Sequence, residues 1–300
     1  MGLFYALGAY LSWGLVVPVH FRLLDGVPAW VILGHRILWS SVFVVLLLAA
    51  LRRVRLVPQR RHALLIVSAL LIGANWSLYL WAVQNGRMLD ASLGYFINPL
   101  VAVALGAVVL GERLRPLQGA AVGIAALGVA VAVATAGTLP WVALALAVSV
   151  ALYALIRKLV PIDPILGFCA ETFLLLPLAL GYLAWLAPAS ASVSALDGRT
   201  LGLLLLTGLS TSVPLIWFAA AVGRLKLATL GLLQYIAPSC LLVLSVLVYG
   251  ETLETSRAIV LALTLVALVL YAVDAVRLSR ADAAARPQAP LTPDPQRCPG

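Results

Sequence analysis

The most constraining feature of this sequence is a succession of apolar runs, each about 20 residues long, separated by short stretches that carry charge, proline or glycine. A helix needs about 20 apolar residues to cross the hydrocarbon core of a bilayer. Charged residues make up 10% of the chain, against about 25% in soluble domains. Because so few polar side chains cannot cover a soluble surface, the sequence predicts an all-α polytopic membrane protein.

Reading the apolar runs between their breaks gives ten predicted transmembrane helices. The residues that follow them, 278–300, are rich in alanine, proline and arginine and cannot bury a core, so they are predicted to form a disordered tail. The predicted helices span residues 3–21, 29–51, 63–85, 90–110, 117–136, 139–157, 164–186, 200–222, 227–249 and 257–276.

The basic residues indicate how these segments are oriented. If the N-terminus is cytoplasmic, 15 of the 20 lysines and arginines fall in inside loops or in the tail, and four fall in outside loops. Arg157 and Lys158 are counted among the inside-loop residues. Since cytoplasmic loops are enriched in lysine and arginine, both termini are predicted to be cytoplasmic. The net charge of +9 is dispersed between apolar segments, which excludes a nucleic-acid partner.

The first half of the chain recurs in the second half. Phe-Ile-Asn-Pro at 96–99 and Gly-Glu-Arg-Leu at 111–114 return as Tyr-Ile-Ala-Pro at 235–238 and Gly-Glu-Thr-Leu at 250–253. Because each unit holds an odd number of spans, the second unit must lie inverted in the membrane. Inverted repeats are typical of transporters, although duplication for stability alone is the competing interpretation. The predicted units are two inverted five-helix repeats, residues 1–136 and 137–277, followed by the cytoplasmic tail 278–300.

Several short motifs resemble those of a known family. The combination resembles the EamA-type drug/metabolite transporters and, more narrowly, their RarD branch. This resemblance implies a permease of the plasma (inner) membrane with ten helices in two inverted repeats, and it favours export as the direction of transport. The motifs are His-Arg-Ile-Leu-Trp-Ser at 35–40, Asn-Trp-Ser-Leu-Tyr-Leu-Trp-Ala at 75–82, Gly-Tyr-Phe-Ile-Asn-Pro at 94–99, Gln-Tyr-Ile-Ala-Pro at 234–238 and Tyr-Gly-Glu at 249–251.

Two prolines at matching positions of the repeat predict breaks in the fourth and ninth segments. Proline has no backbone N–H, so Pro99 frees the carbonyl of Tyr95, and Pro238 frees that of Gln234. A free carbonyl at membrane depth is tolerated where it is buried in protein or lines a wet cavity. Paired breaks of this kind indicate a transport site. The alternative is that both prolines are kinks that shape packing alone.

Uncharged polar side chains gather near the same depth. Asn98 lies three residues after Tyr95, and Tyr79 lies four residues after Asn75, so each pair shares a helix face. An amide without a partner in hydrocarbon costs several kcal/mol, so these groups face the bundle. The predicted pathway is a polar cavity, with hydrogen bonding between helices as the alternative. Its residues are Arg36, Asn75, Tyr79, Tyr95, Asn98, Pro99, Glu171, Gln234, Tyr235 and Pro238.

Two of these pathway residues, Arg36 and Glu171, carry charge inside predicted spans. Charges within the membrane indicate function by default. Their depths place them on opposite sides of the midplane, so we expect Arg36 to serve the outer half of the pathway and Glu171 the inner half, without a direct ion pair. Glu171 is predicted to couple transport to protons. Glu112 and Glu251 lie at helix ends and are predicted to cap helices or pack loops.

The sequence thus predicts a secondary transporter of small metabolites or drugs that works by alternating access. Few intramembrane charges favour a small amphipathic or zwitterionic solute. An enzyme is rejected because the three histidines form no HExxH motif and no pair of intramembrane aspartates exists. The three cysteines indicate no metal site, and no cofactor is expected. A receptor or scaffold, or a channel, stays open as an alternative. The substrate, the direction and the oligomeric state are left open.

Overall fold

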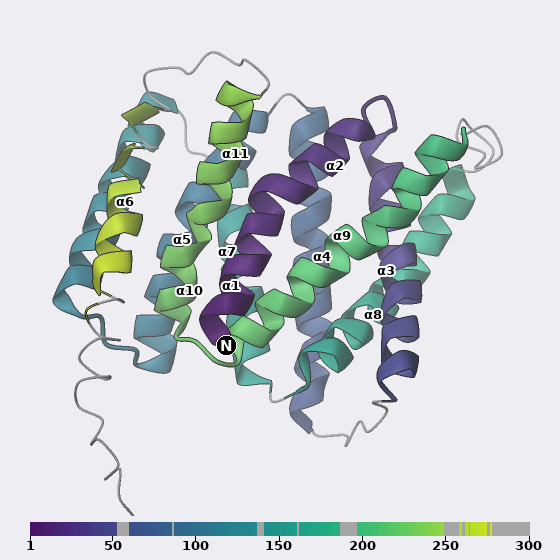
Figure 1. The fold of residues 1–300 in the computed structure, drawn as a ribbon, viewed down its shortest axis with the longest axis horizontal. Helices are drawn as coiled ribbons and strands as arrows, with labels where there is room; N and C mark the ends of the chain where they lie inside the picture. Colours follow the sequence, from purple (N-terminus) through teal and green to yellow (C-terminus); the bar gives the residue numbers. More distant parts are fainter. Residues whose placement is uncertain are drawn as a thin grey trace, which may run out of the picture.

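A computed structural model describes residues 1–52, 60–85, 87–136, 141–160, 162–186, 197–248, 258–259, 262–263, 265–274 and 277. Within these ranges every regular element is helical (Figure 1). The labelled elements are α1 (Gly2–Leu11), η1 (Ser12–Val16), α2 (Val17–Leu23), α3 (Ala29–Leu51), η2 (Arg60–Ala63), α4 (Leu64–Gln84), α5 (Met88–Leu110), α6 (Pro116–Ala136), α7 (Trp141–Leu159), α8 (Pro164–Leu186), α9 (Gly198–Val222), α10 (Leu227–Gln234) and α11 (Ile236–Leu247).

The lengths of the apolar helices agree with the membrane prediction. Four shorter apolar helices fall in the remaining predicted segments. The all-helical, multi-pass class is confirmed, whereas the number of ten crossings and the inverted repeat stay predictions. The helices long and apolar enough to cross a bilayer are Gly2–Leu23, Ala29–Leu51, Arg61–Ala82, Trp141–Leu159, Pro164–Trp185 and Gly198–Val222.

The first span contains a π-helical turn, η1, ahead of Pro18. The N–H of Val17 bonds to the carbonyl of Ser12, and Pro18 has no N–H with which to continue a regular ladder. Gly14 in this turn lies against α11, because a Cβ atom added there would be 2.7 Å from the Cβ of Cys240. The absence of a side chain at Gly14 therefore lets the first span approach α11 closely.

The two prolines of the repeat have different effects on the backbone. The helix of the ninth predicted segment is interrupted at Tyr235, between α10 and α11 and three residues before Pro238. The matching break predicted at Pro99 is wrong, since α5 continues as one helix through that residue. Here the Phe96 carbonyl accepts a hydrogen bond from the Tyr235 hydroxyl at 3.0 Å. The Tyr235 hydroxyl thus joins the α10–α11 junction to α5 at the residue after Tyr95, whose carbonyl Pro99 frees.

The helices pack in a reciprocal arrangement between the two halves of the chain. The first span, α1 with η1, lies against α9, α10 and α11, whereas α7 lies against α4 and α5. At one side of the bundle α3 packs on α8 and α9. At the opposite side, Figure 1 shows α6 beside the short yellow helix of residues 265–274. The polar groups predicted to form the pathway therefore lie on helices of the bundle interior and of the α3–α8 side.

Candidate functional site

A hollow between α4, α5 and α7 brings together four of the predicted pathway residues. Its volume is about 260 Å³ including the space at its mouth. Three of its seven lining residues are small or aliphatic, so the wall is part polar and part apolar. The lining residues are Asn75, Tyr79, Gly94, Tyr95, Asn98, Leu146 and Val150.

The polar side chains of this hollow differ in how many hydrogen bonds they make within the protein. The Asn75 amide donates to the carbonyl of Leu146 at 3.0 Å and to the Ser149 hydroxyl at 2.9 Å, so it ties α4 to α7. The rings of Tyr79 and Tyr95 meet edge to face with centroids 6.1 Å apart. Asn98 is buried, and its Oδ1 atom has no hydrogen-bond partner in the described part of the chain. The hollow therefore contains one fixed amide and one unsatisfied one.

Arg36 on α3 reaches the edge of the hollow through Trp76, the residue that follows Asn75 on α4. Its Nε donates to the Thr211 hydroxyl on α9 at 3.0 Å. The guanidinium carbon lies 4.7 Å from the ring centroid of Trp76 and 5.1 Å from that of Phe21, within the range of cation–π attraction. These contacts hold a positive charge at the edge of the polar hollow.

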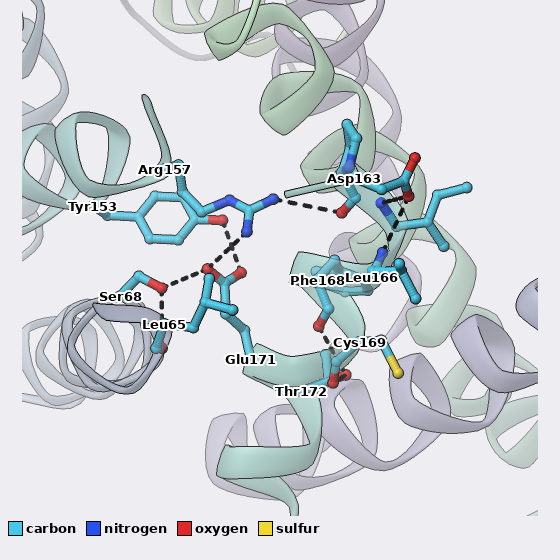
Figure 2. A network of polar contacts seen from close by, with 12 residues as sticks. Leu65, Ser68, Tyr153, Arg157, Asp163, Leu166, Phe168, Cys169, Glu171 and Thr172 are labelled. Atoms are coloured by element: carbon cyan, nitrogen blue, oxygen red, sulfur yellow. Dashed lines mark hydrogen bonds and ion pairs between the residues drawn. The ribbon is translucent and has the colours of Figure 1, made fainter. Parts of the chain in front are cut away.

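Glu171 belongs to a second, separate cluster. Its carboxylate accepts hydrogen bonds from the hydroxyls of Ser68, at 2.6 Å, and of Tyr153, at 3.2 Å (Figure 2). A guanidinium nitrogen of Arg157 lies 3.6 Å from one of the carboxylate oxygens. Glu171 and Arg157 are both buried, with 2% and 6% of their surfaces exposed. The ion-pair partner of Glu171 in the described structure is therefore Arg157 and not Arg36.

The sequence reasoning placed Arg157 and Lys158 in a loop, and this is wrong. Both residues lie in the last turn of α7. Arg157 turns inward because the buried carboxylate of Glu171 stabilises its charge there. The spacing of four between Tyr153 and Arg157 puts both on one helix face, and this was the signal available in the sequence.

Glu112 connects the two halves of the chain. Its carboxylate accepts the backbone N–H groups of Leu227, at 2.8 Å, and of Ala228, at 2.9 Å, at the start of α10. The ammonium of Lys158 lies 3.8 Å from the same carboxylate and donates to the Leu225 carbonyl. The capping role predicted for Glu112 is confirmed. Glu251 lies outside the described residues.

The remaining predicted pathway residues lie apart from the lining of the hollow. Gln234, Tyr235 and Pro238 sit at the junction of α10 and α11, where the Tyr235 hydroxyl binds the α5 backbone. Pro99 faces α10, since a Cβ added at Gly231 would lie 2.7 Å from the Pro99 carbonyl oxygen. These residues join the two halves of the chain and do not line the hollow.

The described residues hold no group of three His, Cys, Asp or Glu side chains that could bind a metal ion. What the structure offers is a helical membrane bundle with a part-polar hollow among its helices. Sites between helices of a bundle are a common place for small-molecule binding. The fold and the hollow together define the class, a polytopic membrane protein with a part-polar hollow among its helices.

Comparison with known proteins gives the family. The model of the EamA-like transporter family matches residues 1–134. An uncharacterized transporter of Vibrio cholerae is 45% identical over 95% of this chain and 96% of its own length. The protein RarD of Escherichia coli is 44% identical over 93% of this chain and 96% of its own. The chain belongs to the EamA-like transporter family, in its RarD branch, and is a membrane transporter of the drug/metabolite class.

One solved crystal structure superimposes on this chain with a TM-score of 0.70 at 21% sequence identity. The match covers 92% of this chain and 98% of the other. At this identity the likeness extends to the fold alone.

Proposed function

We propose that this protein is a secondary transporter that exports a small metabolite or drug by alternating access. The observation that carries the proposal is the hollow at Asn75, Tyr79, Tyr95 and Asn98, because it puts polar groups and aromatic rings inside a bundle of membrane-spanning helices. The pathway would pass this hollow, with Arg36 toward its outer half and Glu171 toward its inner half.

The reciprocal packing of the helices supports two inverted repeats, residues 1–136 and 137–277. Each repeat would place its first span against later spans of the other one, as α1 lies on α9 and α7 lies on α4. A rocking motion between two such units can expose a central site to either side of the membrane in turn.

Polar contacts at one end of the bundle support a closed inner side. Gly2 lies close to Arg224, so the N-terminus is beside the α9–α10 connection that Lys158 and Glu112 bind. If the N-terminus is cytoplasmic, these contacts would seal the cytoplasmic end while the hollow stays reachable from the other side. Export would require that they open to load the solute.

Proton coupling would act through the Glu171 cluster. A proton on Glu171 would remove the negative charge opposite Arg157, 3.6 Å away, and loosen α8 from α7. The groups around Glu171 are Ser68 from α4 and Tyr153 and Arg157 from α7. Protonation from one side of the membrane would thus favour the opening of the inner end.

The test is reconstitution in liposomes that enclose a pH-sensitive dye. Amino acids, chloramphenicol and lipophilic amines are added in turn, with protein-free liposomes as the control. We expect one class to move protons, and the Glu171→Gln variant to lose that movement. Asp163→Asn is the matched variant, since it removes a carboxylate that caps the start of the same helix and asparagine caps equally well. Full gradient-driven flux in Glu171→Gln would contradict the coupling role.

A further inference from the structure

Arg36 carries a charge that the described chain does not neutralise. By contrast, the buried Arg157 faces the carboxylate of Glu171 at 3.6 Å. Arg36 instead contacts two aromatic rings, and its Nε donates a hydrogen bond to the Thr211 hydroxyl. The two terminal nitrogens of Arg36 donate no hydrogen bond to a described residue. They are also not among the side-chain atoms that are buried without a hydrogen-bond partner. Because Arg36 is half-buried, these nitrogens present a pair of donors to open space beside Trp76, the residue that follows Asn75 of the hollow.

A guanidinium with two parallel N–H donors matches the two oxygens of a carboxylate. The ring contacts and the Nε bond orient Arg36 in advance, which lowers the entropy that a bound anion must overcome. Charge in a membrane interior is costly and is retained where it serves a solute or a partner. The geometry of Arg36 thus fits a carboxylate that arrives from outside the chain.

Asn98 supplies a second and independent observation. The residue is 4% exposed, lines the hollow, and its Oδ1 atom is buried without a hydrogen-bond donor among the described residues. Buried polar atoms in native proteins are nearly always paired with protein, water or ligand. Because Oδ1 is an acceptor, the missing partner is an O–H or N–H group.

We propose that Arg36 and Asn98 form the recognition site for an organic acid whose carboxylate lies beside a hydroxyl or N–H donor; this inference rests on the proposed transport function. Arg36 binds the carboxylate, and Asn98 accepts from the neighbouring donor. The rings of Tyr79 and Tyr95 contact the apolar part of the same solute. The space of the hollow, about 260 Å³, includes the open space at its mouth, so only a small solute fits among its lining residues.

Four probes that share one phenyl ring separate the two contacts. Mandelate carries the carboxylate and the hydroxyl, phenylacetate lacks the hydroxyl, mandelamide lacks the charge, and phenylacetamide lacks both. Their affinities are measured by calorimetry on the purified full chain in lipid nanodiscs. We expect mandelate to bind tightest. Replacing the carboxylate by the amide should weaken binding roughly 10- to 100-fold, and removing the hydroxyl roughly 2- to 12-fold.

Substitutions at Arg36 and Asn98 test which residue causes the preference for the carboxylate and which the preference for the hydroxyl. Arg36→Gln should abolish the difference between mandelate and mandelamide, and Asn98→Leu the difference between mandelate and phenylacetate. Arg224→Gln is the matched control, because Arg224 also stacks on an aromatic ring, 5.3 Å from the centroid of Tyr5, and lies away from the hollow. If the Arg36→Gln variant does not fold, protection of Arg36 from phenylglyoxal by mandelate is measured on the unmodified protein.

Equal affinity for mandelate and mandelamide, no binding of any of the four probes, or an unchanged preference in Arg36→Gln would overturn the inference. Binding at equilibrium requires no transport, so the two proposals can fail separately. Selective binding without flux in liposomes would contradict the transporter proposal alone. Flux of a solute with no preference for the acid over its amide would contradict the recognition role of Arg36 alone.

Discussion

The buried pair of Arg157 and Glu171 allows a quantitative test of how the inner end is held together. At the 3.6 Å separation of the two groups, Coulomb's law with an effective dielectric constant of about 20 gives an attraction of about 4.6 kcal/mol. Removing one partner of a buried ion pair costs about 3–5 kcal/mol, because the other charge is left uncompensated. The two figures agree, so Arg157→Met should lower the free energy of unfolding by about 3–5 kcal/mol.

A double-mutant cycle tests whether this loss belongs to the pair. Ser68 and Tyr153 donate to different oxygens of Glu171, so Glu171→Gln keeps an acceptor for one of the two hydroxyls. We expect it to cost less than Arg157→Met, because Arg157 in the last turn of α7 can extend toward water. The variant that combines both changes leaves no unpaired charge. It should regain most of the stability, with a coupling energy of about 3 kcal/mol, the upper end of the measured range.

The assay is unfolding in mixed micelles of a mild detergent and sodium dodecyl sulfate, followed by tryptophan fluorescence. All four proteins of the cycle are measured in the same micelle series. If the combined variant loses the sum of the two single losses, the residues do not interact energetically and the reasoning from their distance is wrong.

Three further predictions concern other contacts. Gly231→Ala should lower the free energy of unfolding by about 1–3 kcal/mol, because the new Cβ would lie 2.7 Å from a backbone oxygen of α5. The control in the same assay is Gly202→Ala, where the new Cβ has no neighbour within 4 Å and the change should be neutral or stabilising. Glu112→Ala should cost about 1–2 kcal/mol by uncapping α10, and faster amide exchange in the first turn of α10 would report it. A hydrogen bond from Thr200 lowers the pKa of Asp197, so the α9 cap should stabilise above about pH 4 and weaken as the pH falls below it. Amide protection in α9 should follow that titration, and Asp197→Asn should remove it.

The sequence by itself determined the class of this protein and indicated four of the seven residues that line its hollow. Runs of about 20 apolar residues leave a chain few alternatives to crossing a membrane as helices. The helical period then places Asn75 with Tyr79 and Tyr95 with Asn98 on shared faces, and hydrocarbon drives those faces inward. This is why four of the predicted pathway residues line one hollow in the structure.

The tertiary structure alone decided which residues become partners. Arg36 bonds to Thr211, Glu171 to Ser68, and the Glu112 carboxylate caps a helix that begins at Leu227. Each of these contacts joins segments about 100 residues or more apart in the chain. Periodicity specifies the face of a helix but not the neighbour that covers it, because that neighbour depends on how all the helices pack together. For the same reason the sequence could not show that α5 continues through Pro99, or that the Tyr235 hydroxyl bonds to the Phe96 carbonyl of that helix.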